Sequence, residues 1–165
     1  MSNTGLKRPA FYVHFRDRSE LLLRVVEHIG DELFAMADRW LQGDDPLADA
    51  KAALDGVAAV YVVHGPVLRA LSEAASSDAV LEQAYNALLQ AFVDATAEHI
   101  RAEQRAGRTP AALDPERTAM ALTHMNERVL TESLGRSPQD DPARVAESLL
   151  RIWLATLYGV TAENA

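Results

Sequence analysis

The chain has 165 residues, no cysteine and a net charge of −8, and 48% of its residues are apolar. This composition excludes disulfides and cysteine-based zinc sites, and it provides enough apolar residues for a globular core. We see no secretory signal and no apolar run near the ~20 residues that cross a bilayer, so we expect a cytoplasmic protein without a membrane partner.

The charge is unevenly distributed along the chain. Residues 1–18 carry a net charge of +3, and the rest of the chain carries −11. A basic tip on an acidic body suits a local contact with phosphates, because the body repels nucleic acid elsewhere. The alternative is a solvated surface cluster of a few charges.

Start and stop signals of helices recur along the chain. Three Asp-Pro pairs can begin helices, because aspartate can cap a helix and proline fits its first position: Asp45-Pro46, Asp114-Pro115 and Asp141-Pro142. After each pair, apolar residues recur at spacings of three and four. Such segments end at glycines, as is typical of the position after a helix: Gly107, Gly135 and Gly159.

These signals predict an all-α fold, because no segment alternates apolar and polar residues as a strand does. Asp17 and Glu20 resemble a capping box at the start of the second helix. Gly65-Pro66 is expected to end the third helix. In chain order we predict helices at about 6–14, 18–41, 46–64, 66–75, 78–106, 115–134 and 142–158.

The first predicted helix lies in the stretch TGLKRPAFYVHF, residues 4–15. Gly5 allows a tight turn, and Phe11 and Phe15, four residues apart, form a face that can be buried. A short amphipathic surface helix is the alternative interpretation. The residues left available to phosphates and base edges, with the first residue of the next helix, are Lys7, Arg8, Ala10, Tyr12, His14 and Arg18.

This stretch resembles the turn and recognition helix of the TetR family of transcriptional regulators. Residues 122–128, with the core Met-Asn-Glu-Arg, and residues 152–159 resemble the last two helices of its ethionamide-resistance repressor subgroup. The seven helices then correspond to the family's third to ninth, and the first two helices are missing from the chain as written.

The resemblance implies a TetR-like helical bundle in two parts. Residues 1–41 are a remnant of the helix-turn-helix DNA-binding domain, and residues 42–165 are the ligand-binding and dimerisation domain. The last two helices are expected to form a four-helix bundle with those of a second copy, which gives a homodimer.

Asn126 is the polar exception on an apolar helix face that also carries Leu122, Val129 and Leu130. From the residues alone, a core asparagine bonded to a neighbouring helix is the favoured explanation, and a polar anchor in an apolar pocket is the other. The resemblance favours the pocket, because the subgroup binds elongated hydrophobic ligands there. Carried over by position, it implies these ligand-binding residues: Val60, His64, Tyr85, Leu89, Phe92, Thr123, Asn126, Glu127, Leu130 and Trp153.

Catalytic and metal-binding motifs are not seen. The five histidines form no His-Glu-x-x-His or Glu-x-x-His pattern, and there is no Gly-x-Ser-x-Gly elbow or phosphate-binding glycine loop. We therefore expect no enzyme, no cofactor and no metal site.

The function implied is a ligand-responsive regulator of the repressor type that binds operator DNA as a homodimer. We expect weak DNA binding from the chain as written, because the two helices that hold the recognition helix in place are missing. The alternative is a helical ligand-binding or interaction module without a role on DNA.

Overall fold

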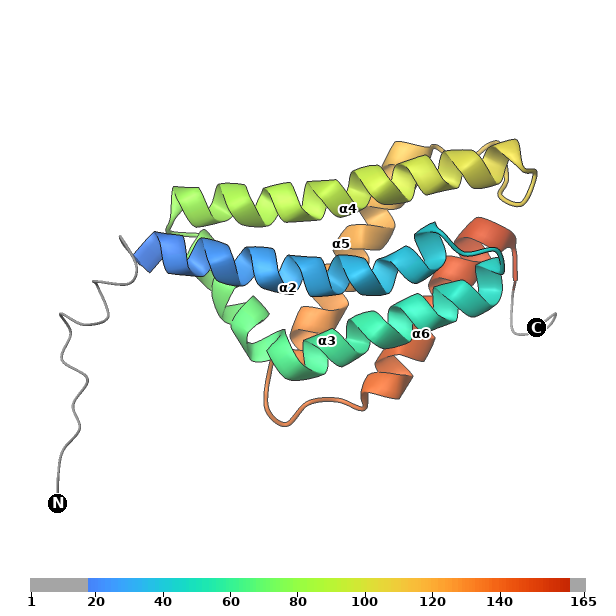
Figure 1. Ribbon diagram of the computed structural model, residues 1–165. Helices are drawn as coiled ribbons and strands as arrows, with labels where there is room; N and C mark the ends of the chain where they lie inside the picture. Colours follow the sequence, from blue (N-terminus) through green and yellow to red (C-terminus); the bar gives the residue numbers. More distant parts are fainter. Residues whose placement is uncertain (1–17, 161–165) are drawn as a thin grey trace, which may run out of the picture.

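The computed structural model describes residues 18–160, in which it contains five helices and no strand. The all-α prediction is therefore confirmed for this part of the chain. The predicted helix at 6–14 and the Asp17 cap lie outside the described residues. The helices, labelled as in Figure 1, are α2 (Arg18–Leu41), α3 (Pro46–Ala75), α4 (Ala79–Arg105), α5 (Pro115–Leu134) and α6 (Pro142–Tyr158).

All three Asp-Pro pairs begin helices as predicted. The Asp45 carboxylate accepts hydrogen bonds from the backbone nitrogens of Leu47 and Ala48, at 3.2 and 3.1 Å. Asp114 and Asp141 each accept one such bond of 3.0 Å from the first turn of α5 and of α6. These bonds satisfy amides that have no partner inside the helix, so the sequence defines where α3, α5 and α6 begin.

The glycines at the helix ends differ in conformation. Gly107 and Gly159 have φ angles of +74° and +66°, in the left-handed region that favours glycine. Gly135 follows the last residue of α5, as predicted, but its φ of −84° lies in the ordinary right-handed region. A Cβ at Gly135 would lie 3.1 Å from Cβ of Arg69, so close packing against α3 also favours glycine there.

The predicted break at Gly65-Pro66 is wrong, because α3 continues through it as one helix of 30 residues. Proline lacks the N–H that would bond the carbonyl four residues earlier, which here belongs to Val62. The side-chain amide of Gln139 replaces that donor, at 3.1 Å from the Val62 oxygen, and it also donates to the Leu134 oxygen at 2.7 Å. The helix bends in this region and continues (Figure 1).

Gly65 lets the bent part of α3 lie directly against the end of α5. A Cβ at this position would lie 2.4 Å from the carbonyl oxygen of Leu134 and 2.9 Å from its carbonyl carbon. Both neighbours are backbone atoms, which no rotamer change can move. The glycine-proline pair therefore shapes the contact between two helices.

α3 is also the most apolar helix of the bundle. Its length and composition alone would suffice to cross a membrane. Ten of its residues are buried, however, and they form the centre of the helical bundle. Burial thus explains part of the apolar character of α3, while Leu47, Val62, Val63 and Val67 are exposed apolar residues of the same helix.

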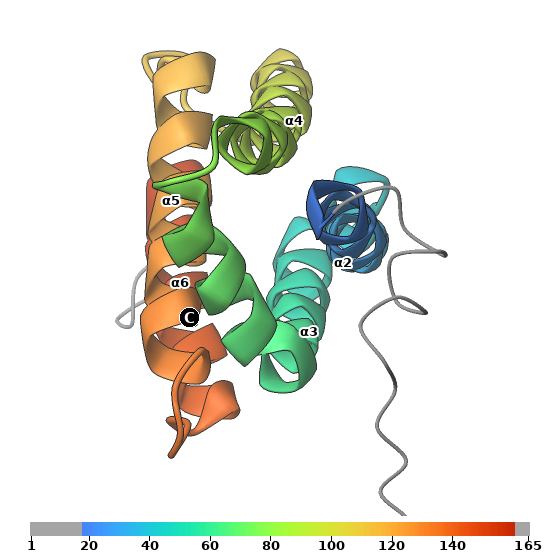
Figure 2. The same cartoon turned by 90° about the vertical axis from the view of Figure 1, so that its left-hand side faces the viewer.

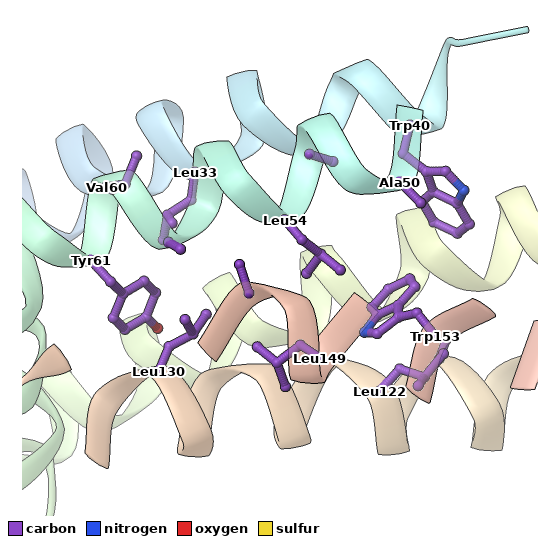
Figure 3. Close-up of a cluster of buried hydrophobic side chains, with 14 of the residues drawn as sticks. Leu33, Trp40, Ala50, Leu54, Val60, Tyr61, Leu122, Leu130, Leu149 and Trp153 are labelled. Atoms are coloured by element: carbon purple, nitrogen blue, oxygen red, sulfur yellow. The ribbon is translucent and has the colours of Figure 1, made fainter. Parts of the chain in front are cut away.

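The other helices surround α3. α2 and α3 lie side by side, and α4 packs against α2 on the side away from α3 (Figures 1 and 2). α5 and α6 pack against α3 and complete the bundle. The second half of α3 leans toward α5 (Figure 2). Side chains from all five helices meet in one main core, where Ile100, Leu130, Leu134 and Leu157 are almost completely buried. Figure 3 shows part of this core, with Leu33, Tyr61 and Leu130 among its side chains.

Candidate functional site

A cavity of about 110 Å³ lies among the five helices. It is smaller than the roughly 150 Å³ of an engineered apolar cavity that holds one benzene molecule. Nearly all of its wall is aliphatic or aromatic. The lining residues are Leu33, Ala37 and Trp40 of α2; Ala50, Ala53, Leu54, Val57, Tyr61 and Leu68 of α3; Tyr85, Leu88, Leu89, Phe92 and Thr96 of α4; Thr123, Asn126, Glu127 and Leu130 of α5; and Trp153 of α6.

The structure brings together eight of the ten residues expected at the ligand site. Val60 and His64 are the two that do not line the cavity. Val60 is buried in the core, while His64 points toward α2, where its Nε2 lies 3.1 Å from a carboxylate oxygen of Glu32. Tyr61, one residue after Val60, lines the cavity instead. On α3, the positions implied by the family resemblance therefore lie on the neighbouring face of the helix.

The contribution of α2 was missed altogether. Leu33, Ala37 and Trp40 line the cavity, although the sequence interpretation placed α2 with the DNA-binding part. Leu33 and Trp40 belong to the apolar stripe of that helix, so a signal of burial was present. It could not show whether the stripe packs on a solid core or on a cavity.

Asn126 has one of its two polar atoms paired. Its side-chain oxygen accepts a hydrogen bond from the indole Nε1 of Trp153 at 3.0 Å. An indole N–H can only donate, so the amide oxygen must face Trp153 and the NH₂ group is directed elsewhere. We find no acceptor for that NH₂ group among residues 18–160, which leaves its two donors available at the cavity wall.

Glu127 gives the cavity a carboxylate. One oxygen accepts hydrogen bonds from the hydroxyls of Tyr85, at 2.8 Å, and Thr131, at 3.3 Å. Burial, with the negative charge of Glu127 as a further cause, raises the pKa values of Tyr61 and Tyr85 well above the usual range. Both phenols therefore stay neutral, and the carboxylate is surrounded by hydroxyl groups.

Trp40 forms the opposite wall and connects it to a polar cluster. Its ring lies 4.0 Å from that of His99 and 5.2 Å from that of Trp153, between centroids. Figure 3 shows the two tryptophans facing each other from α2 and α6. The Trp40 indole donates to the Tyr158 hydroxyl at 3.0 Å, and this hydroxyl is hydrogen-bonded to Glu103.

Glu103 holds this cluster together from a buried position. Both of its oxygens accept from Nε of Arg108, at 3.0 and 3.1 Å, and Arg108 lowers the pKa of this carboxyl. Burial lowers the pKa of His99, and burial raises the pKa of Tyr158 to about 12. The end of α2 is thereby attached to α4 and α6 through Trp40.

The residues expected to contact DNA fall mostly outside the described residues. These are Lys7, Arg8, Ala10, Tyr12 and His14. Arg18 is the first residue of α2.

Known proteins resemble the chain over most of its length. A family model described as the C-terminal domain of the transcriptional regulator EthR matches residues 36–159. The chain belongs to the EthR family. The HTH-type transcriptional regulators EthR of Mycobacterium tuberculosis and Mycobacterium bovis are 30% identical to it over 166 residues, which cover 94% of this chain and 74% of theirs. The EthR of Mycolicibacterium smegmatis is 28% identical over 162 residues.

A solved structure agrees with the helical architecture of this EthR-family protein. The crystal structure of a putative TetR-family transcriptional regulator from Rhodococcus sp. matches with a TM-score of 0.71 and 22% identity, over 90% of this chain and 80% of that one. The TetR-like bundle is thus confirmed. The named relatives are transcriptional regulators rather than enzymes.

Proposed function

We propose that this protein is a ligand-responsive transcriptional regulator of the repressor type, which binds a hydrophobic small molecule in the central cavity. The observation that carries the proposal is the position of α2. Three of its residues line the cavity, and the helix begins at Arg18, directly after the segment that resembles a recognition helix. A ligand in the cavity therefore contacts the element that leads to the DNA-reading segment.

The size of the cavity supports a coupling between ligand and shape. At about 110 Å³ it is too small for an elongated molecule, so such a ligand has to move side chains or separate helices. Every helix contributes to the wall, and α2 is the one whose movement reaches the DNA-reading segment. A ligand that binds the expanded form better shifts the population toward it.

The proposed regulator acts as a dimer of two copies of the chain. We expect α5 and α6 of one copy to pack against α5 and α6 of the other. Many of their apolar residues are buried within one copy, but Met120 and Ile152 are 50% and 46% exposed. Met125, Val145 and Leu150 are partly exposed on the same helices.

Two recognition segments related by twofold symmetry must match major grooves that recur every ~34–36 Å, so a few ångströms of separation decide operator binding. Sedimentation velocity at micromolar concentration should show a dimer. A single monomeric species there would contradict this part of the proposal.

Ligand binding can be tested through the two tryptophans of the chain. Trp40 and Trp153 both line the cavity, and the sequence contains no other tryptophan, so fluorescence excited selectively at tryptophan reports on the cavity wall. A series of linear esters and amides of increasing length should shift the emission and stabilise the folded protein by RT ln(1 + [L]/Kd), which raises Tm. If no member of the series changes either signal, the ligand-sensing function is wrong.

The role on DNA needs its own measurement. Fluorescence anisotropy with labelled DNA from the region upstream of the gene gives the affinity of the protein for DNA. It is measured with and without a ligand identified by the fluorescence and Tm series, at several salt concentrations. A regulator should show a ligand-dependent change in affinity. A ligand that binds tightly but leaves the affinity for DNA unchanged would favour the alternative of a binding module.

A further inference from the structure

Glu127 is exceptional among the glutamates of the described residues. Five glutamates in residues 18–160 are wholly or partly shielded from solvent: Glu20, Glu32, Glu103, Glu127 and Glu132. Four of them face a basic side chain within 4.0 Å, namely an arginine or a histidine. For Glu127 we find hydroxyl partners only, and no lysine, arginine or histidine lines the cavity to which it belongs.

The hydrogen bonds of Glu127 do not account for its charge. Tyr85 and Thr131 both donate to Oε1, and we find no partner for Oε2 within residues 18–160. A glutamine has one side-chain oxygen and would accept the same two bonds without a negative charge. A carboxylate that is partly removed from water without a cation is unfavourable, so its charge needs a compensating partner.

The rest of the cavity wall suits a cation with an apolar body. Five aromatic side chains line the same space, and their π faces attract cations: Trp40, Tyr61, Tyr85, Phe92 and Trp153. Asn126, the residue before Glu127 on α5, also lines the cavity, and its amide oxygen already accepts a hydrogen bond from Trp153. The free carboxylate oxygen of Glu127 is therefore the acceptor best placed for an N–H donor of a ligand.

We propose that the cavity selects a hydrophobic amine, with its ammonium group at Glu127 and its apolar body among the aromatic and leucine side chains. This inference rests on the proposed function and specifies the ligand class of the same site. It replaces the expectation of a ligand held mainly by Asn126 with one held mainly by an ion pair.

The test compares two probes of the same shape, 4-phenylbutylamine and 4-phenylbutan-1-ol, near neutral pH. Kd is measured from the tryptophan fluorescence and from the shift in Tm on the full chain. The wild-type protein should bind the amine at least about tenfold more tightly than the alcohol, as expected for a desolvated charge pair. Glu127→Gln should lose this preference while it still binds the alcohol.

Glu32→Gln is the matched control, because Glu32 is also half-buried but lies between α2 and α3, away from the cavity lining. It should keep the preference for the amine. If the wild-type protein binds the alcohol as tightly as the amine, the cavity is a ligand site and the amine inference is wrong. If neither probe nor any ester or amide binds, the proposed function fails as well. The wild-type comparison decides the matter even if Glu127→Gln does not fold.

Discussion

Replacing Gly65 with alanine tests whether the bend of α3 is built on a backbone contact. The added Cβ would lie 2.4 Å from the Leu134 oxygen, whereas ordinary contact begins at 3.4 Å, so the two backbones must separate by about 1 Å. Such a separation also strains the bonds from Gln139 to the carbonyls of Val62 and Leu134, which span the same junction.

The magnitude follows from opposing contributions to the free energy of unfolding. Alanine in a helix interior is about 1 kcal/mol more favourable than glycine. Overpacking costs roughly 1–3 kcal/mol, and partial weakening of the two hydrogen bonds of Gln139 costs about 1 kcal/mol in total. We expect Gly65→Ala to lose roughly 1–3 kcal/mol. Since 1 kcal/mol corresponds to about 3 °C for a chain of this size, Tm should fall by roughly 3–9 °C.

Gly56→Ala is the control in the same helix. Its Cβ would lie 2.6 Å from the sulfur of Met36, at the end of a flexible side chain that can turn away. This variant should range from neutral to about 1 kcal/mol more stable than wild type. Thermal unfolding is measured at one protein concentration, because dimerisation makes Tm concentration-dependent. Equal stability of Gly65→Ala and Gly56→Ala would show that the backbone contact at Gly65 does not shape the bend.

Three further predictions concern the cavity and its surroundings. Asn126→Leu should reduce the stabilisation by an ester or amide ligand by about 1–2 kcal/mol, measured as the shift in Tm, because one hydrogen bond is lost. Leu89→Trp should fill the cavity and remove the ligand-induced shift, while sedimentation still shows a dimer. Burial lowers the pKa of His99, so the folded protein binds a proton less readily than the unfolded chain. The contribution of neutral His99 to the free energy of unfolding is therefore fully present above about pH 6.5, and it decreases as the pH falls through that value. His99→Phe should lose less stability than wild type between about pH 7.5 and 5.5 in urea unfolding, and an equal loss would show that another group is responsible.

The helix starts could be predicted because they depend on local chemistry. An aspartate before a proline satisfies the first-turn amides whatever the rest of the chain does, and α3, α5 and α6 begin where this pattern predicts. The continuity of α3 could not be predicted in this way. The donor that Pro66 lacks is supplied by Gln139, which lies 73 residues later in the chain and reaches Val62 only in the folded structure.

The cavity residues show the same division. The positions implied by the family resemblance include the cavity-lining polar residues of α5 and the cavity-lining aromatic residues of α4. Both helices are regular, so their spacing in the sequence also gives the face on which each side chain lies. The resemblance failed by one residue at Val60 and by a helix face at His64, whose Nε2 lies within hydrogen-bond distance of Glu32 on α2 rather than at the cavity. The missing basic partner of Glu127 is a property of all the surrounding helices together, so no single segment could reveal it.

At the bend of α3, a side-chain hydrogen bond from the amide of Gln139 stands where a regular helix has a backbone hydrogen bond. A backbone hydrogen bond in a helix opens only when the helix itself unravels, whereas a side chain can rotate away and return on the timescale of rotamer changes. The bond from Gln139 is thus a part of the bend that can open without unravelling α3. Tyr61 and Leu68 lie on either side of Pro66 and both line the cavity, so we expect opening of this bond to loosen the stretch of α3 that shapes the cavity.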